Sequence, residues 1–326
     1  MGNLSVGTFN PVGHATALSE VMAGVPLRLL QELTAPARVD LAKTMRRSMG
    51  LGNAPMPMSL DPAESYLPPE GVARLVHSDL PSMLIGGMSA LLLQTLHPLA
   101  MAGVAEHSNY QDDPLGRLRR TAHFVGTTTF GSVRDAEKAV AQVRRVHRRV
   151  VGIAPDGRPY SANDPDLVTF IHAAEVSSFL ASARRFGPRD LTPEQCDRYY
   201  DEMAPVALAL GADWVPRSAG EVDDYFRRLR PELVAGAQAL QARDWLRRGV
   251  TRRPEEKAFY AVLHGAAVST LPRWARVELG LAAPAPFDLL RETTVVMPVS
   301  RAVSSLLRWL ATPQTVRERP PSTATT

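Results

Sequence analysis

A long stretch without a formal charge, residues 82–105, constrains the fold of this chain more than any other feature. It reads SMLIGGMSALLLQTLHPLAMAGVA and approaches the length of a membrane-spanning helix. Polar and helix-breaking residues interrupt it near its middle, at Gln94, His97 and Pro98. We therefore expect a buried, kinked helix in the core of a folded domain rather than a membrane span.

The composition supports one large folded domain. Of the 326 residues, 45% are hydrophobic and 21% are charged, which allows a substantial core and excludes a globally disordered chain. The net charge of +4 permits an acidic ligand or an anionic surface without requiring nucleic acid. The lone Cys196 excludes an internal disulfide and a thiolate metal cluster, which suits a reducing compartment. Because the first residues lack a basic start followed by an apolar run, we expect no secretory signal and a cytoplasmic protein.

Between its two ends the chain has a helical pattern. Apolar residues recur at three- and four-residue spacing, in runs divided by turns such as QDDPLG and APDGRPYSANDPD. Asn163 or Asp164 is placed to cap a helix that has Pro165 in its first turn, and Ser218 precedes Glu221 at capping-box spacing. These signals predict an all-α protein with about ten helices in one globular domain.

Three regions are expected along the chain. Residues 1–65 are punctuated by proline and glycine, so we expect an N-terminal arm that packs on the core. Residues 66–311 form the helical domain, and residues 312–326 are expected to be a disordered tail. Within the domain, only TTVVMPV at 293–299 has a β-like pattern, which Pro298 interrupts.

One histidine lies within a basic stretch, AQVRRVHRRVVG at 141–152. On a helix spanning 134–151, His147 falls in the middle of an apolar stripe, whereas the arginines before and after it fall on the flanks and the far side. His147 is therefore either a core histidine hydrogen-bonded to a carbonyl or an inward-facing ligand. The other members of the stripe are Ala136, Val140, Val143 and Val150.

A second group of polar residues shares one helix face in DPLGRLRRTAHFVGTTTFG. Arg117, Arg120, Thr121 and Phe124 recur at helical spacing. Two guanidinium groups and a hydroxyl beside an aromatic ring can hold a carboxylate or donate to a bound oxygen species. The same pattern is also typical of an ordinary solvated basic face.

Two further histidines are placed among apolar residues. His172 and Glu175 share a helix face with Val168 and Phe179, so they need partners or a metal unless they satisfy each other. His97 lies at the expected kink, because the following proline disfavours α geometry. Together with His147 and the Arg120–Thr121 pair, these residues indicate a cofactor or metal pocket between helices.

Four segments resemble one known family in order and spacing. LLLQTLHPLAMAGVAEHS, GRLRRTAHFV, VRRVHRRVVG and GRPYSANDPDLVTFIHA are similar to segments of the MpaB / rubber-oxygenase catalytic domain family. That family includes latex-clearing proteins and a fungal enzyme that cleaves an isoprenoid side chain. The resemblance covers roughly residues 66–310.

The resemblance implies an all-α fold that binds haem b between helices and uses dioxygen to oxidise or cleave an apolar substrate. It makes His147 the expected iron ligand, with His97 and His172 as alternative ligands or distal groups. Arg117, Arg120 and Thr121 match an Arg-x-x-Lys-Thr motif in which Arg120 replaces the lysine. Arg120 and Thr121 are the expected catalytic donors to dioxygen, and Arg117 and Phe124 are expected to line the cofactor site. The arginines beside His147 or on the Arg117 face are candidates to bind the haem propionates.

Two other functions stay open. One is a non-haem iron enzyme with His172, Glu175 and another histidine as ligands. The other is a non-catalytic helical protein that binds an apolar ligand or contacts an anionic membrane surface through its basic faces. We expect no nucleic-acid partner. We expect as substrate a small isoprenoid, lipid or secondary metabolite rather than rubber itself, and the oligomeric state stays undetermined.

Overall fold

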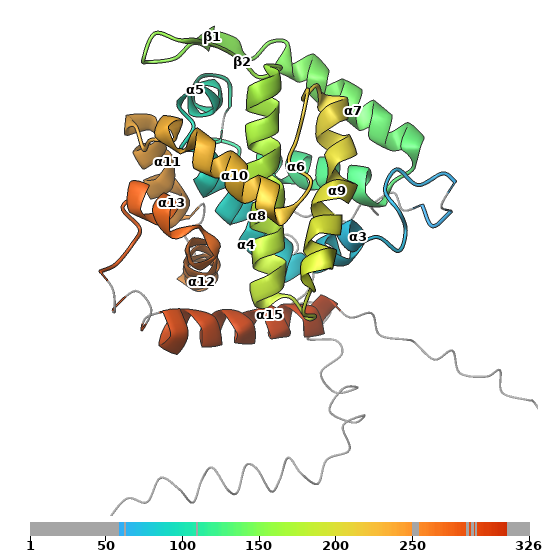
Figure 1. Cartoon of the computed structure of the whole chain (residues 1–326). Helices are drawn as coiled ribbons and strands as arrows, with labels where there is room; N and C mark the ends of the chain where they lie inside the picture. The colour runs from blue at the N-terminus through green and yellow to red at the C-terminus, as the bar shows by residue number, and fades with distance from the viewer. Residues whose placement is uncertain are drawn as a thin grey trace, which may run out of the picture. The chain divides into compact units, whose positions relative to one another are not determined.

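The computed structural model describes residues 59–311, except 62, 109, 250–253, 285–286, 288–289 and 291. This part of the chain is all-α apart from one short hairpin, as predicted (Figure 1). In chain order its elements are α3 (Val72–His77), α4 (Leu80–Gln94), α5 (Pro98–His107), α6 (Pro114–Phe130), α7 (Val133–His147), β1 (Val151–Ile153), β2 (Pro159–Ser161), α8 (Pro165–Phe186), α9 (Pro193–Leu210), α10 (Ala219–Leu229), the 3-10 turn η1 (Arg230–Glu232), α11 (Ala237–Arg248), α12 (Pro254–Thr270), α13 (Arg273–Glu278), the π-helical η2 (Glu292–Val296) and α15 (Met297–Ala311).

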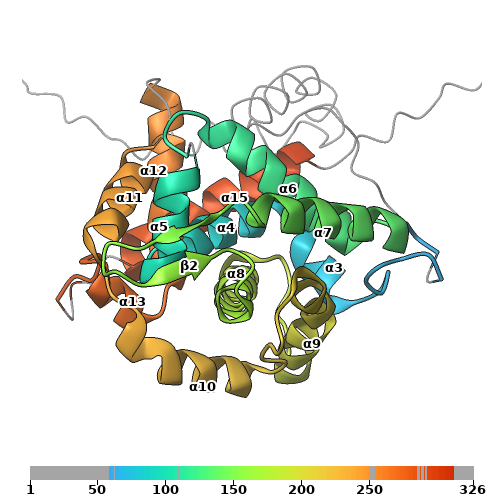
Figure 2. The same ribbon diagram turned by 90° about the horizontal axis from the view of Figure 1, so that it is seen from above.

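Helices α4 and α8 form the centre of the core, and Figure 2 shows α8 end-on with the other helices around it. The two run antiparallel: the Ser182 hydroxyl donates to the Ser82 carbonyl at 2.8 Å, and the Gln94 amide donates to the Ile171 carbonyl at 3.4 Å. Helices α3, α9 and α12 pack around this pair. Of the candidate residues, the buried face of α8 holds His172.

The uncharged stretch forms two helices rather than one. α4 and α5 are bent by 106° at the break that ends in His97, whose extended backbone (φ −88°, ψ 115°) suits a residue before proline. Most of the residues of α4 are buried. This agrees with the predicted kinked core helix. In the described part of the chain no single helix could span a membrane by length and hydropathy, and α4 with α5 passes that test only as a bent pair.

Both predicted helix starts are present. The Asp164 carboxylate accepts from the backbone N–H groups of Asp166 and Leu167, with Pro165 in the first turn of α8. The Ser218 hydroxyl accepts from the Glu221 N–H at the start of α10. Side-chain oxygens at these positions satisfy N–H groups that have no partner within the helix.

The predicted helix over 134–151 is too long. α7 ends at His147, and after a short turn the chain enters β1, which pairs antiparallel with β2. The turn between the strands contains Gly157 at φ +87°, a conformation that favours glycine. The sequence indicated only a turn in this region. The two strands were not predicted because they are too short to show a period of two.

The β-like segment 293–299 is helical, which agrees with the all-α prediction and with Pro298 as an interruption of the strand pattern. It spans η2 and the first turn of α15, where a proline such as Pro298 is tolerated. α15 buries Ser300, Ser304 and Leu307, and it packs against α4 and α12. The threonines and valines of 293–299 are themselves exposed or half-buried, so their helical state goes with the packing of the following turns of α15 and not with their own burial.

The predicted arm and tail fall almost entirely outside the described residues. Of the arm, only its last residues are described, and they run along the end of α6. The Ser59 N–H donates to the Phe130 carbonyl at 2.7 Å, and Ser65 forms a bridge with Ser132. The tail, residues 312–326, lies wholly outside the described part.

Candidate functional site

His97 is buried at the break between α4 and α5. Its ring packs on Phe170 of α8, with centroids 4.8 Å apart and planes tilted by 48°. Burial lowers its pKa, although the negative charge of Glu232 acts in the opposite direction. Its Nδ1 is buried and has no hydrogen-bond partner within the described structure. His97 is thus a neutral imidazole with one ring nitrogen unused.

His147 is the last residue of α7 and is half-buried, below Ala136 and Val140, which are fully buried. Burial lowers its pKa, and a hydrogen bond from the ring to the backbone of Ala162 opposes that effect. Its Nδ1 is buried without a partner among the described residues. The four nearby arginines are all exposed, so the histidine and the arginines belong to different surfaces, as the helical phase predicted. These arginines are Arg144, Arg145, Arg148 and Arg149.

His172 and Glu175 lie on α8, one turn apart. Burial lowers the pKa of His172 to about 4 and raises that of Glu175 to about 7. The His172 Nε2 is buried and unpartnered within the described structure, and no hydrogen bond between the two side chains occurs there. They do not, therefore, satisfy each other, which was one of the two interpretations of the sequence.

The four residues predicted on one face of α6 divide into two pairs. Arg117 is half-buried and donates to the Ser108 hydroxyl at 2.7 Å, and Phe124 packs against the main core. Burial lowers the pKa of Arg117. Arg120 is exposed and pairs at 3.3 Å with Asp113, the residue that caps α6, while Thr121 is also exposed. Only Arg117 and Phe124 face the interior in this structure.

Three further buried hydroxyls lack partners in the described part of the chain, those of Ser89 on α4, Thr127 on α6 and Ser300 on α15. Buried polar atoms in native proteins are nearly always hydrogen-bonded, and each unpaired one costs about 1–3 kcal/mol. Here such atoms occur on α4, α6, α7, α8 and α15, at the α4–α5 break and at Asn163 before α8. A group bound between helices could supply partners for such atoms, which would explain why they are unpaired in the protein alone.

The ligand chemistry separates two kinds of iron site. A two-histidine-one-carboxylate site needs three side chains together, and among the described residues no three His, Cys, Asp or Glu side chains form such a group. A haem iron needs one axial imidazole from the protein, because the porphyrin supplies the other ligands. His97, His147 and His172 each have one buried ring nitrogen without a partner among the described residues, which is the single protein ligand that a haem iron needs.

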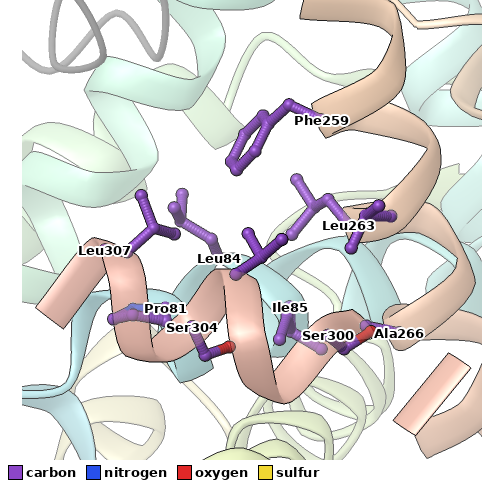
Figure 3. Close-up of a pocket in the computed structure, with 11 residues that line it drawn as sticks. Pro81, Leu84, Ile85, Phe259, Leu263, Ala266, Ser300, Ser304 and Leu307 are labelled. Carbon is purple, nitrogen blue, oxygen red and sulfur yellow. The ribbon is translucent and has the colours of Figure 1, made fainter. Parts of the chain in front are cut away.

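Two cavities lie elsewhere. A narrow apolar pocket of about 10 Å³ is enclosed by α4, α12 and α15, with Leu84, Phe259 and Leu307 in its wall (Figure 3). A wider cleft of about 610 Å³ lies beside α3 and the start of α9, with Arg189 and Arg198 at its edge. Neither is lined by the candidate histidines.

Sequence reasoning missed two buried histidines, His264 of α12 and His77 of α3, and the contacts of His77 define its role. Its Nδ1 lies 2.7 Å from the Thr129 hydroxyl and its Nε2 lies 2.9 Å from the Tyr199 hydroxyl. Burial lowers its pKa to about 3, so it is neutral. With both ring nitrogens engaged, His77 is a structural residue. Because α3 is only six residues long, no helical periodicity marked it in the sequence.

Three comparisons with known proteins complete the description. Residues 74–302 match the sequence model of one family, described as "ER-bound oxygenase mpaB/B'/Rubber oxygenase, catalytic domain". Comparison with curated proteins and with solved structures gave no match. The matched range begins in α3 and ends in α15, so it contains every candidate site residue.

Proposed function

Because the chain belongs to the mpaB/rubber oxygenase catalytic-domain family, we propose that it is a haem b-dependent oxygenase acting on an apolar small molecule. Membership of the family supports oxygenase chemistry. The dependence on haem, the use of dioxygen on an isoprenoid-, lipid- or secondary-metabolite-like substrate, and the residue roles below are the proposal. Bound haem would supply an iron position at which dioxygen can be activated.

The observation that carries the proposal is the state of the His147 ring. The backbone of Ala162 acts on the ring and opposes the effect of burial on its pKa, and Nδ1 is buried and has no partner among the described residues. A histidine that binds a metal commonly has its second ring nitrogen turned toward a backbone carbonyl or a carboxylate. Burial also keeps the imidazole neutral, and only the neutral form can bind iron. On this basis we propose that His147 would hold the haem iron.

The other site residues receive roles by their chemistry. Arg117 offers a half-buried cation for a haem propionate, and Phe124 offers an apolar contact for the macrocycle. His97 and His172 are buried imidazoles that burial keeps neutral, and either is the alternative ligand. Arg120 and Thr121 are the proposed donors to dioxygen. For Arg120 this role requires release from Asp113, with which it pairs in this structure.

An apolar substrate suits the helices that carry these residues. Leu91 of α4, Val125 of α6 and Ile171 of α8 are partly buried and pack on the main core. Since burial keeps the histidines uncharged, they place no net charge beside a substrate. Such surroundings favour a hydrocarbon-rich molecule over a charged one.

The test is the visible absorption spectrum of the full chain, expressed with haem supplied, with and without carbon monoxide. A Soret band that shifts with carbon monoxide is expected. Replacing His147 with alanine should reduce haem retention at least tenfold, and imidazole added to His147→Gly should restore the band. His123→Ala, at an exposed position of α6, is the matched control and should leave the spectrum unchanged.

Two results would contradict the proposal. One is the absence of haem uptake on titration, and the other is stoichiometric iron without porphyrin in the purified protein. An unchanged spectrum in His147→Ala would remove that residue from the ligand role. Loss of the band in His97→Ala or His172→Ala instead would identify the ligand there.

A further inference from the structure

The end of α7 and the hairpin that follows it form an exposed surface of mixed character. We call this the hairpin edge and define it by Arg145, Val146, Arg148, Arg149, Val151 and Ile153. Its aliphatic side chains are far more exposed than such residues usually are: Val146 is 50%, Val151 is 51% and Ile153 is 61% exposed. Figure 1 shows the hairpin at one extremity of the molecule, continuous with α7.

The pairing of the two strands fixes which side chains face outward. Gly152 lies opposite Tyr160, and Tyr160 is buried against α5, where its hydroxyl donates to the Glu106 carboxylate. Because side chains alternate along a strand, Val151 and Ile153 must then face away from the protein. The contact of Tyr160 with α5 holds the hairpin in this orientation. The exposure of Val151 and Ile153 is therefore a fixed feature of the fold.

The arginines of the hairpin edge are free to meet an outside partner. Arg145, Arg148 and Arg149 are exposed, and within the described residues none of them forms an ion pair. The acidic residue of the hairpin itself, Asp156, is already paired with Arg158 at 2.9 Å. The edge therefore presents uncompensated positive charge beside exposed aliphatic side chains.

We propose that the hairpin edge docks on an anionic lipid surface. Arginines at the level of the lipid phosphates and aliphatic side chains entering the acyl boundary together match both chemistries of such a surface. Nucleic acid would use the arginines alone and would leave Val151 and Ile153 in water. Docking does not require haem, and it therefore stands or falls separately from the proposed oxygenase activity.

A second exposed apolar stripe provides an internal comparison. On α15, Val299, Leu306 and Trp309 are 40–47% exposed on the outer face. Figure 1 shows α15 at the opposite side of the molecule from the hairpin, so one flat membrane cannot contact both. The outer face of α15 has a single exposed arginine, Arg301, among its described residues. The hairpin edge has three exposed arginines and the outer face of α15 has one, so we place the lipid contact on the hairpin edge.

Sedimentation of the full chain with lipid vesicles tests the proposal. Binding is expected to vesicles of phosphatidylcholine and phosphatidylserine in a three-to-one ratio, to be weak with phosphatidylcholine alone, and to fall with added salt. Each arginine near such a surface contributes roughly a fivefold gain in partitioning, so the triple variant Arg145→Gln, Arg148→Gln, Arg149→Gln should bind about a hundredfold more weakly.

The apolar half of the edge needs a separate variant. Val151→Thr with Ile153→Thr keeps the branched side chains that suit a strand and should weaken binding several-fold. The matched control is Val299→Thr with Leu306→Gln on α15, which should bind like the unchanged protein. Circular dichroism of each variant verifies that the fold is retained, which keeps a loss of binding interpretable.

Three results would overturn the proposal. The first is no binding of the unchanged chain to phosphatidylserine vesicles. The second is loss of binding in the α15 variant with no loss in the hairpin variants, which would place the lipid contact on α15. The third is equally tight binding to a DNA duplex at the same salt concentration, with no effect of the two threonine substitutions.

Discussion

The backbone of Gly86 in α4 lies directly against Phe179 in α8. A Cβ atom at position 86 would stand 2.9 Å from the Phe179 Cα and 3.0 Å from the Ser178 carbonyl oxygen. Both obstacles belong to the backbone, so they cannot rotate out of the way as a side chain can. The closest approach of the two central helices thus depends on the missing side chain of one residue.

Replacing Gly86 with alanine should therefore destabilise the protein although alanine is the better helix former. Overpacking of a core contact costs about 1–3 kcal/mol, which exceeds the gain of roughly 1 kcal/mol in helix propensity. Gly87→Ala is the control, because its Cβ would meet Phe179 Cε1 at an ordinary 3.8 Å. Urea unfolding should show a loss of stability for Gly86→Ala and none for Gly87→Ala. Equal effects of the two substitutions would show that the contact between position 86 and the α8 backbone does not limit how closely the two helices pack.

A second pair joins distant parts of the chain. Arg308 of α15 donates to both carboxylate oxygens of Asp79, at 2.7 and 2.8 Å, and Asp79 also caps α4 by accepting from the Ser82 N–H. Burial alone would raise the pKa of Asp79, but the hydrogen bonds from Arg308 and Ser82 bring it below its usual value. The ion pair thus attaches α15 to the start of α4.

Asp79→Asn should lower the free energy of unfolding by about 2 kcal/mol at neutral pH. Asparagine keeps the capping oxygen and removes the charge, while Arg308 remains partly exposed, which reduces the cost below that of a fully buried pair. Since the pKa of Asp79 is lowered, its contribution is present at neutral pH and is lost only as the pH falls through that lowered value. Urea unfolding of Asp79→Asn, Arg308→Gln and the double variant measures the coupling. If the stability losses of the two single variants added up to the loss of the double variant, the two residues would not be coupled.

Local sequence signals predicted much of the frame of the site. Helical phase alone separated His147 from its arginines, and the Asp164–Pro165 pair marked the start of α8 correctly. The proline after His97 located the break between α4 and α5. These features depend on residues within one or two turns of each other, so their causes are visible in the sequence.

Other features depend on contacts between remote segments. The partners of His77 are 52 and 122 residues away in the sequence, so no local pattern could identify them. Segment 293–299 is helical where η2 packs on α12 and α15 packs on α4 and α12, contacts that its local pattern does not reveal. The pairing of Arg120 with Asp113 is local in the sequence, but it depends on which rotamer the exposed arginine adopts, and a sequence pattern does not specify the rotamer.

The contact between His77 and Tyr199 leads to a third prediction. Tyr199→Phe removes the hydroxyl that lies 2.9 Å from the His77 Nε2 and leaves this buried nitrogen unpaired. The expected loss of stability is about 1–3 kcal/mol. Tyr200→Phe removes a neighbouring hydroxyl that has no hydrogen bond among the described residues, and it should cost much less. Thermal unfolding of both variants checks the difference, and similar costs would argue against the His77 contact.

The effect of replacing Glu175 on the stability of the protein should depend on pH. Burial raises its pKa to about 7 in the folded protein, whereas 4.5 is the ordinary value for an unfolded chain. Between these two values the folded state holds the proton and the unfolded state does not, so stability falls as the pH rises. Above pH 7 the carboxylate is charged in both states, and its burial costs the folded protein the full amount.

Glu175→Gln should therefore unfold like the unchanged protein near pH 4.5 and should be more stable by about 2 kcal/mol near pH 8. Glutamine matches the shape of the protonated carboxyl group and does not ionise. Urea unfolding of haem-free protein at the two pH values measures the difference, so the result does not depend on the cofactor. Glu137→Gln, on the exposed face of α7, is the control and should show the same difference from the unchanged protein at both values. If the gain from Glu175→Gln did not grow with pH, the carboxyl group would have to be charged at a lower pH than burial implies, through a partner that stabilises its charge.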